Sequence, residues 1–149
     1  MNWIYKKNKI TNSDDFPEGT YGFVYKITHT PSEKSYLGKK VLIFNRKTKL
    51  TKKDLLMYEG MKGRKPTYKI VQKESDWKSY YGSNKPLLEL LQKEPLENFH
   101  REILILSHTK KLLTYYETQA LFTYRVLEED DKWFNDNILG KFFRKDFDI

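Results

Sequence analysis

Two short runs of the chain, residues 21–28 and 34–38, are rich in aromatic and β-branched residues, which is typical of β-strands. Between them lies Thr30-Pro31-Ser32-Glu33-Lys34, in which proline fixes φ and serine can bond the local backbone, as in a turn. The pattern therefore predicts a β-hairpin that brings Tyr25 and Tyr36 onto one small sheet. A plain core hairpin has the same composition, so the two tyrosines alone do not decide between packing and function.

Further elements are predicted on both sides of a central strand. Residues 99–107 read FHREILILS, and the nearly continuous Ile and Leu at their end suit a strand buried on both faces. Apolar spacing predicts a helix from residue 109 to about 128, and another that has Pro86 near its start and runs to about residue 93. Residues 51–54 can cap a short helix. This order predicts an α/β fold with a small three-stranded antiparallel sheet flanked by helices.

The length of 149 residues suits one domain with a modest core. We expect residues 1–19 to form a mostly polar N-terminal arm, anchored by Trp3, Ile4 and Tyr5, and residues 20–149 to form a single domain with a basic insertion at about 41–78. No apolar run approaches the roughly 18 residues of a membrane span, and none near the N-terminus suits a secretory signal. With no cysteine in the chain, we expect no disulfide, no thiolate zinc site and a cytoplasmic location.

The net charge of +8 is concentrated in one part of the chain. Residues 39–78 hold thirteen Lys or Arg against four acidic residues, a surplus of nine. Such a block is either a solvated surface or a groove that follows phosphates. Aromatic residues make up 15% of the chain, which suits either core packing or the stacking of bases. The candidates for contact with nucleic acid are Lys39, Lys47, Lys52, Lys53, Lys62, Arg64, Lys65, Tyr80 and Tyr81.

The two strands resemble the signature of the GIY-YIG nucleases, written here as Phe23-Val24-Tyr25 and Tyr36-Leu37-Gly38. Three later positions match that family in order and approximate spacing. Arg46 stands where the family carries an arginine on a helix, Glu117 stands where it places a metal-binding glutamate on a long helix, and Asn135 stands where it has an asparagine beyond that helix. The resemblance covers most of residues 21–143. Some branches of the family also have a histidine one helical turn after the arginine, and Leu50 occupies that position here.

The resemblance implies a metal-dependent DNA endonuclease. Glu117, on a helix side between two apolar stripes, would hold Mg²⁺ or Mn²⁺, because a hard cation needs few protein ligands when waters and phosphate oxygens complete its shell. The alternative for Glu117 is an ion pair with a surface lysine, Lys110 or Lys111.

The two tyrosines are then the candidates for activating water. A free phenol titrates near pH ~10, so we expect Lys39, Lys40 and Arg46 to lower the pKa of the catalytic one. Tyr25 is the preferred base and Tyr36 would orient the water or the phosphate, although the reverse assignment stays open.

The remaining site residues would handle the phosphate and the local geometry. Arg46 would clamp the scissile phosphate, or Lys40 would do so if the helix lies in a different register. Asn135 would either fix the local geometry or touch the substrate backbone; the alternative is a simple turn residue.

Three functions stay open at this point. The first is a phage-encoded endonuclease of the homing or mobile type, which acts on double-stranded DNA in the host cytoplasm. The others are a catalytically silent nucleic-acid-binding or inhibitor protein on the same scaffold, and a structure-specific repair nuclease. RNA also suits a basic, aromatic surface. Specificity would come from the basic insertion, from the N-terminal arm or from the formation of a homo-oligomer.

Overall fold

The computed structural model describes residues 2–147. Five strands form the main sheet: β1 (Trp3–Tyr5), β2 (Asn8–Ile10), β3 (Gly22–His29), β4 (Lys34–Val41) and β7 (Phe99–Ser107). Two further strand pairs are β5 (Ile43–Lys49) with β6 (Tyr68–Glu74), and β8 (Asn137–Ile138) with β9 (Phe142–Phe143). The α-helices are α1 (Lys52–Leu56), α2 (Lys85–Lys93) and α3 (Lys110–Thr123). Short 3-10 turns lie at Ser13–Asp15, Trp77–Ser79, Leu96–Asn98 and Arg144–Phe147.

The main sheet has the strand order β2-β1-β7-β3-β4, so the predicted α/β class is confirmed but the predicted three strands are wrong. Strands β3, β4 and β7 are antiparallel neighbours, as predicted, whereas β1 pairs with β7 in parallel. The two additional strands come from the N-terminal segment that the sequence reads as a polar arm. Each is only three residues long, which is too short for a periodic pattern to develop. The fully buried Trp3, whose indole Nε1 donates to the Trp77 carbonyl at 2.8 Å, holds this segment in place.

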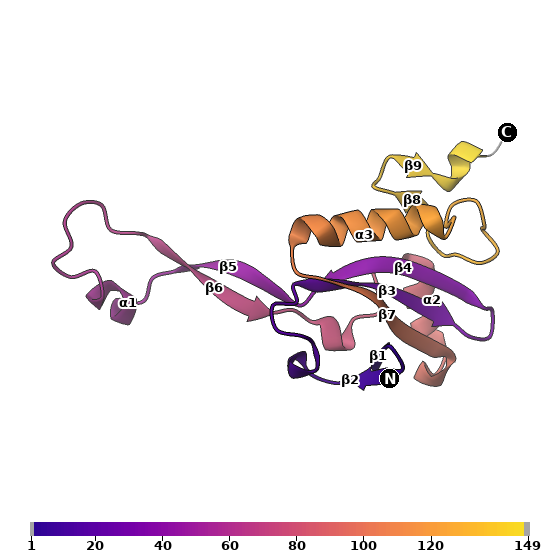
Figure 1. The fold of residues 1–149 in the computed structure, drawn as a ribbon, viewed down its shortest axis with the longest axis horizontal. Coiled ribbons are helices and arrows are strands. Elements are labelled where there is room, and N and C mark those ends of the chain that lie inside the picture. The colour runs from indigo at the N-terminus through magenta and orange to yellow at the C-terminus, as the bar shows by residue number, and fades with distance from the viewer. Residues whose placement is uncertain (1, 148–149) are drawn as a thin grey trace. The chain divides into compact units, whose positions relative to one another are not determined.

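Side chains alternate between the two faces of the sheet and build a separate core on each. One core contains Trp3, Phe23, Tyr25 and Phe99 together with Leu87 from α2. The second core lies under α3. Its members are Val24, Leu37, Leu113, Ala120, Leu121, Val126, Leu127, Trp133 and Ile138. Figure 1 shows α3 lying across β3, β4 and β7.

The two longer helices predicted from the apolar spacing are found, with one difference at an end. Helix α2 begins after Asn84, whose side chain accepts from the Leu87 N–H, and Pro86 lies in its first turn. Helix α3 ends at Thr123 instead of continuing to about residue 128. Arg125 has a φ of 54°, which stops the helix, yet Val126 and Leu127 remain buried beyond it. The apolar spacing therefore continues past the end of the helix because the following turn also packs into the core.

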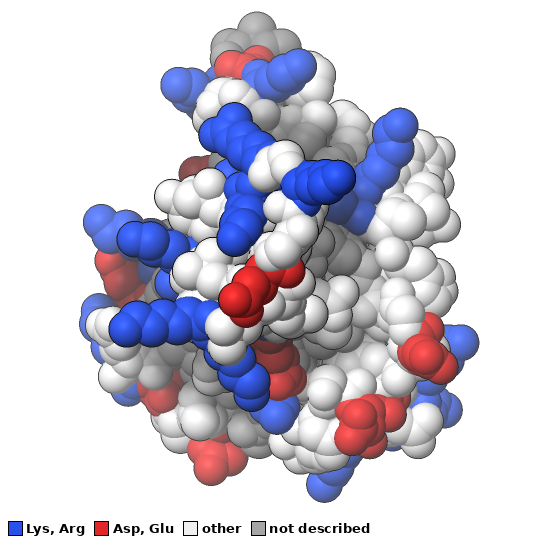
Figure 2. Space-filling view, turned by 90° about the vertical axis from the view of Figure 1, so that its left-hand side faces the viewer, with Lys and Arg blue, Asp and Glu red and all other residues white. Residues whose placement is uncertain are grey.

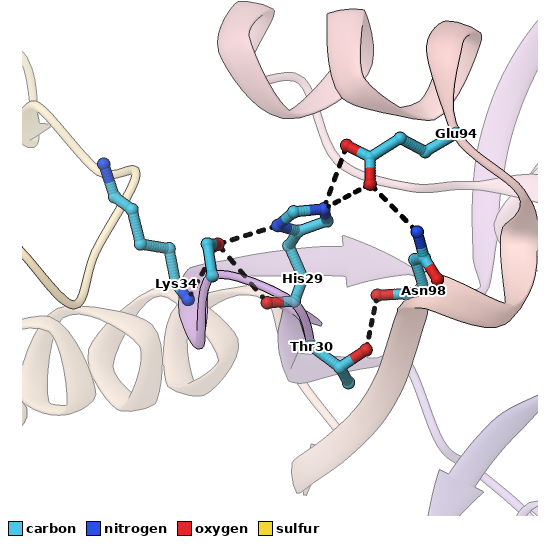
Figure 3. A network of polar contacts seen from close by, with 6 residues as sticks. His29, Thr30, Lys34, Glu94 and Asn98 are labelled. Carbon is cyan, nitrogen blue, oxygen red and sulfur yellow. Dashed lines mark hydrogen bonds and ion pairs between the residues drawn. The ribbon is translucent and has the colours of Figure 1, made fainter.

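A polar network fixes the turn of the β3–β4 hairpin, as Figure 3 shows. The buried His29 donates from Nε2 to the Glu94 carboxylate at 2.9 Å, and its Nδ1 hydrogen-bonds the Ser32 hydroxyl at 2.7 Å. Asn98 donates to the same carboxylate at 2.9 Å. The hairpin is thereby tied to the segment that connects α2 to β7.

Residues 43–75 form a compact unit of their own and are described by themselves. Strands β5 and β6 pair as an antiparallel ribbon, and α1 lies in the connection between them. The predicted cap of α1 is confirmed: Thr51 accepts from the Asp54 N–H, and the Asp54 carboxylate accepts from the Thr51 N–H. The helix expected around Arg46 is wrong, because Arg46 lies on β5 opposite Val71. Ile, Phe and Thr in this stretch favour a strand.

Across residues 2–147, every helix is too short or too polar to cross a membrane.

Candidate active site

Two glycines lie against the side chains of Tyr25 and Tyr36. Tyr25 on β3 lies opposite Gly38 on β4, and a Cβ added to Gly38 would stand 2.6 Å from the Tyr25 hydroxyl. The second glycine, Gly82, has a φ of +90°. A Cβ added to Gly82 would stand 3.2 Å from the Tyr36 ring and 3.4 Å from the Tyr25 hydroxyl. The ring centres of Tyr25 and Tyr36 are 6.2 Å apart. Glycine at both positions leaves the space that the two phenols occupy.

Tyr80 belongs to the same cluster, although its sequence position suggested a contact with nucleic acid. Its ring packs edge-on against Tyr25 with centres 5.8 Å apart. The Lys40 ammonium lies 3.9 Å from the centre of the Tyr80 ring, within the range of a cation–π contact, and pairs with the Asp76 carboxylate. Lys40 is therefore held beside the tyrosine cluster by two partners.

The pKa of both catalytic candidates shifts upward, against the expectation of a lowered phenol pKa. Burial raises the pKa of Tyr25 well above its ordinary value, and Tyr80 adds to the shift. Burial also raises the pKa of Tyr36, although a hydrogen bond with Ser83 opposes the change. The expected cations have other partners: Lys40 pairs with Asp76, and the Lys39 ammonium donates to the Thr114 hydroxyl at 2.8 Å.

Glu117 lies on α3, half-buried over the sheet. Burial raises the pKa of its carboxyl, while the Lys39 charge and a hydrogen bond from the Lys39 backbone lower it. Lys39, rather than Lys110 or Lys111, is thus the lysine whose charge acts on this carboxylate. Glu117 lies between two apolar stripes of the helix and therefore faces the sheet, as the helical spacing predicted.

Tyr36 and Glu117 meet in one cavity of about 310 Å³ at the edge of the sheet, where β4 is the last strand. The cavity is lined by Tyr36, Leu37, Ser83, Asn84, Lys85, Pro86, Glu117, Leu121, Asn135, Asp136, Asn137 and Leu139. Tyr25 does not line it. The structure therefore separates the two phenols, with Tyr36 at the cavity and Tyr25 in the core behind it.

The buried side chain of Asn135 supports the local geometry. Its amide oxygen accepts from the Leu37 N–H at 3.0 Å, and its amide nitrogen donates to the Leu37 carbonyl at 2.8 Å. Arg144 in turn donates to the backbone carbonyl of Asn135. Of the two roles that the sequence left open, these contacts favour fixing the geometry, because both polar ends of the amide bond β4.

Most of the remaining basic candidates belong to another unit of the chain. Arg46, Lys47, Lys52, Lys53, Lys62, Arg64 and Lys65 belong to the separate unit of residues 43–75. Tyr81 has a packing role: the Cζ atom of the buried Arg101 lies 4.2 Å from the centre of its ring and 4.6 Å from the centre of the Trp3 ring.

Sequence reasoning missed three residues of the site. Arg101 donates to the carbonyls of Lys78 and Tyr80 at 2.9 Å and so holds the segment that carries Tyr80. Ser83 bonds Tyr36, and Asp136 lines the cavity. Asp136 follows Asn135 directly, which was the one available signal; the other two are brought in by contacts between distant segments.

A family model matches most of the chain. The family model described as "Putative endonuclease segE, GIY-YIG domain" matches residues 3–138. The matched range includes the tyrosine cluster, Glu117 and Asn135, and it also includes β1 and the unit of residues 43–75. No curated protein and no solved structure gives a significant match to the chain.

Proposed function

Because this chain belongs to the GIY-YIG endonuclease family, we propose that it hydrolyses phosphodiester bonds of double-stranded DNA at the cavity that Tyr36 and Glu117 share. One observation carries the proposal. A phenol from the hairpin and a carboxylate from a helix about eighty residues later line one polar cavity at a sheet edge. A polymer can reach an edge of this kind.

The donor groups of the cavity fit a hard divalent cation. Among residues 2–147 no group of three or more His, Cys, Asp or Glu is arranged so that it could hold a metal ion, so a closed protein cage is absent from the described chain. One half-buried carboxylate, Glu117, with Asp136 on the same lining, suits Mg²⁺ or Mn²⁺, which keep water and phosphate oxygens as ligands. When bound, such a cation stabilises the negative charge that develops on the leaving oxygen.

Tyr36 is the phenol that contacts the reacting groups in this proposal. It lines the cavity and has a raised pKa, so at neutral pH its protonated hydroxyl donates a hydrogen bond to the attacking water or to a phosphoryl oxygen. Tyr25 packs behind it and keeps Tyr36 and Tyr80 in place. Tyr36 can accept the proton of the water only after positive charge arrives near its oxygen.

The basic unit of residues 43–75 is proposed to bind the DNA backbone. It holds ten Lys or Arg against three acidic residues, a surplus of seven, whereas the whole chain has a net charge of +8. Figure 2 looks onto the left-hand side of Figure 1, where β5, β6 and α1 are drawn, and several Lys and Arg side chains are visible on this face. Within this unit Arg46 is a proposed phosphate contact. Of the cations outside it, Lys40 remains the candidate beside the tyrosines.

A plasmid-cleavage assay tests the proposal. The wild type is compared with Glu117→Gln, with and without Mg²⁺ and with EDTA, and Glu89→Gln on the exposed side of α2 serves as the matched control. We expect Mg²⁺-dependent cutting by the wild type and by Glu89→Gln. Glu117→Gln should lose at least a hundredfold in rate while it still binds DNA. Equal cutting by both variants would remove Glu117 from the site.

The same assay separates the remaining alternatives. If the wild type binds DNA but never cuts it, the protein is a silent binding or inhibitor protein. Preferred cutting at branches, on matched linear, supercoiled and branched substrates, would identify a structure-specific nuclease. A defined site on linear duplex would support the homing or mobile type, and a rate that rises steeply with protein concentration would support a homo-oligomer.

A further inference from the structure

The β5–β6 ribbon presents two different faces, because residues opposite each other on paired strands point to the same side. Asn45 lies directly opposite Gln72, which places two carboxamide side chains together. The neighbouring pairs on that side are Ile43 with Glu74, Lys47 with Ile70 and Lys49 with Tyr68. We call this side, Ile43, Asn45, Lys47, Lys49, Tyr68, Ile70, Gln72 and Glu74, the amide face.

All side chains of the amide face are exposed, and Ile70 has an exposed fraction of 73%. On the opposite face Thr48 and Lys69 are half-buried, and the Lys69 ammonium pairs with the Asp54 carboxylate of α1 at 2.7 Å. The amide face has no half-buried member and is the more exposed of the two. A two-stranded ribbon exposed in this way is only marginally stable by itself, and a partner that covers it would stabilise it.

A basic hollow adjoins the amide pair. It has a volume of about 510 Å³ and is lined by Lys47, Arg64, Lys65, Pro66, Thr67 and Tyr68. The Lys47 ammonium lies 4.9 Å from the centre of the Tyr68 ring, so the ring holds this cation at the wall of the hollow. Lys47 follows Asn45 by two positions on the same face. Anion-binding groups therefore stand immediately beside groups that can read a base.

The chemistry of this surface favours duplex DNA as its occupant. The surplus of seven positive charges in residues 43–75 complements a polyanion. The major groove of B-DNA, about 12 Å wide, admits a two-stranded β-ribbon, and Asn or Gln side chains pair with adenine through its N6 and N7 atoms there. The major groove of an RNA duplex is too narrow for a ribbon to enter.

We propose that the amide face enters the major groove of duplex DNA, where Asn45 and Gln72 select adenine and the cations of the hollow hold the adjacent phosphates. This assignment rests on the proposed function, since it supplies the sequence preference of that nuclease. It makes the ribbon the source of specificity and leaves the cavity of Tyr36 and Glu117 to the chemistry.

The test maps where the protein cuts. The wild type and the double variant Asn45→Ala/Gln72→Ala digest a plasmid library that carries a randomised segment, and the new ends are sequenced. We expect adenine to be enriched at least about fivefold at one or two positions a fixed distance from the wild-type cut. In the products that it still forms, the variant should lose the enrichment. Asn8→Ala/Gln92→Ala, which removes two exposed carboxamides outside the ribbon, should keep it.

A parallel selection separates this inference from the nuclease itself. Glu117→Gln, with and without the two ribbon substitutions, is mixed with the same random duplexes, and the bound DNA is recovered and sequenced. If the wild type cuts nothing but adenine enrichment still depends on Asn45 and Gln72, the proposed function fails and the ribbon assignment stands. An unchanged base preference in the ribbon variant, or the absence of any preference in the parent, would overturn the assignment. So would equal competition by duplex RNA.

Discussion

Replacing Asn135 should destabilise the sheet edge by an amount that its contacts predict. Its amide makes two hydrogen bonds, of 3.0 and 2.8 Å, to the backbone of Leu37, and both residues are buried. In Asn135→Ala the N–H and the carbonyl of Leu37 lose these partners. A net loss of about 1 kcal/mol for each bond, and a further cost for desolvated groups left unpaired, gives about 3 kcal/mol. At about 2–4 °C per kcal/mol, the Tm should fall by roughly 6–12 °C.

The tryptophan fluorescence of the protein suits this measurement. The three tryptophans, Trp3, Trp77 and Trp133, are all buried and lie outside residues 43–75, so their signal follows the main sheet rather than the ribbon. Urea and thermal unfolding of the wild type and of Asn135→Ala would then give the change in the free energy of unfolding. Asn137→Ala is the matched control, because the bonds of Asn137 go to Asp136 and Gly140 at the exposed surface.

A second substitution separates hydrogen bonding from packing. Asn135→Asp keeps the size of the side chain and the acceptor for the Leu37 N–H, but it places a carboxylate oxygen against the Leu37 carbonyl. It should therefore cost at least as much as Asn135→Ala at neutral pH. If Asn135→Ala costs under about 1 kcal/mol, or no more than Asn137→Ala, water replaces the amide and Asn135 does not hold β4. A harmless Asn135→Asp would show that the hydrogen bond to the Leu37 carbonyl contributes little.

Two further outcomes follow from the same structure. Gly38→Ala would place a Cβ 2.6 Å from the Tyr25 hydroxyl and should cost about 1–3 kcal/mol by overpacking; unchanged urea unfolding would show that the ring moves freely. The hydrogen bond from His29, and then that from Asn98, holds the pKa of Glu94 below its ordinary value of 4.5. The stability from this carboxylate is therefore present above pH ~4.5 and lost as the pH falls through the lower folded pKa. Glu94→Gln should have a lower free energy of unfolding than the wild type at pH 6, and this difference should become smaller as the pH falls. A difference that does not change with pH would contradict the reasoning. The control Glu89→Gln should show no such difference.

Sequence predicted those elements whose signal is local. The β3–β4 hairpin, the cap of α1 at Thr51, and α2 with Pro86 in its first turn all depend on residues close together in the chain, and all are found. β1 and β2 were missed because three residues carry too little pattern. Their place in the sheet depends on Trp3 reaching Trp77, a contact between distant segments that periodicity cannot reveal.

The prediction that nearby cations lower the pKa of the catalytic phenol was wrong, and the alternation of side chains along β4 explains why. Lys39 and Lys40 are adjacent in sequence, but neighbouring residues of a strand point to opposite faces. Lys39 extends to Thr114 and Glu117 on the α3 side, whereas Lys40 extends to Tyr80 and Asp76 on the other. Proximity along the chain therefore overstated the positive charge near either phenol, and burial raises the pKa of both.

The cavity exists because a side chain replaces backbone pairing at the edge of β4. The Ser35 N–H donates to the Lys132 carbonyl at 2.9 Å, and the Ser35 carbonyl accepts from the Phe134 N–H at 2.8 Å, as a further strand would do. Two residues on, at Leu37, the partner is instead the Asn135 amide. The Asn135 side chain thus hydrogen-bonds the N–H and the carbonyl of Leu37 without a further strand lying against β4 at this point. This protects an edge that could otherwise pair with another chain, and it leaves room for the cavity that Tyr36 and Glu117 line.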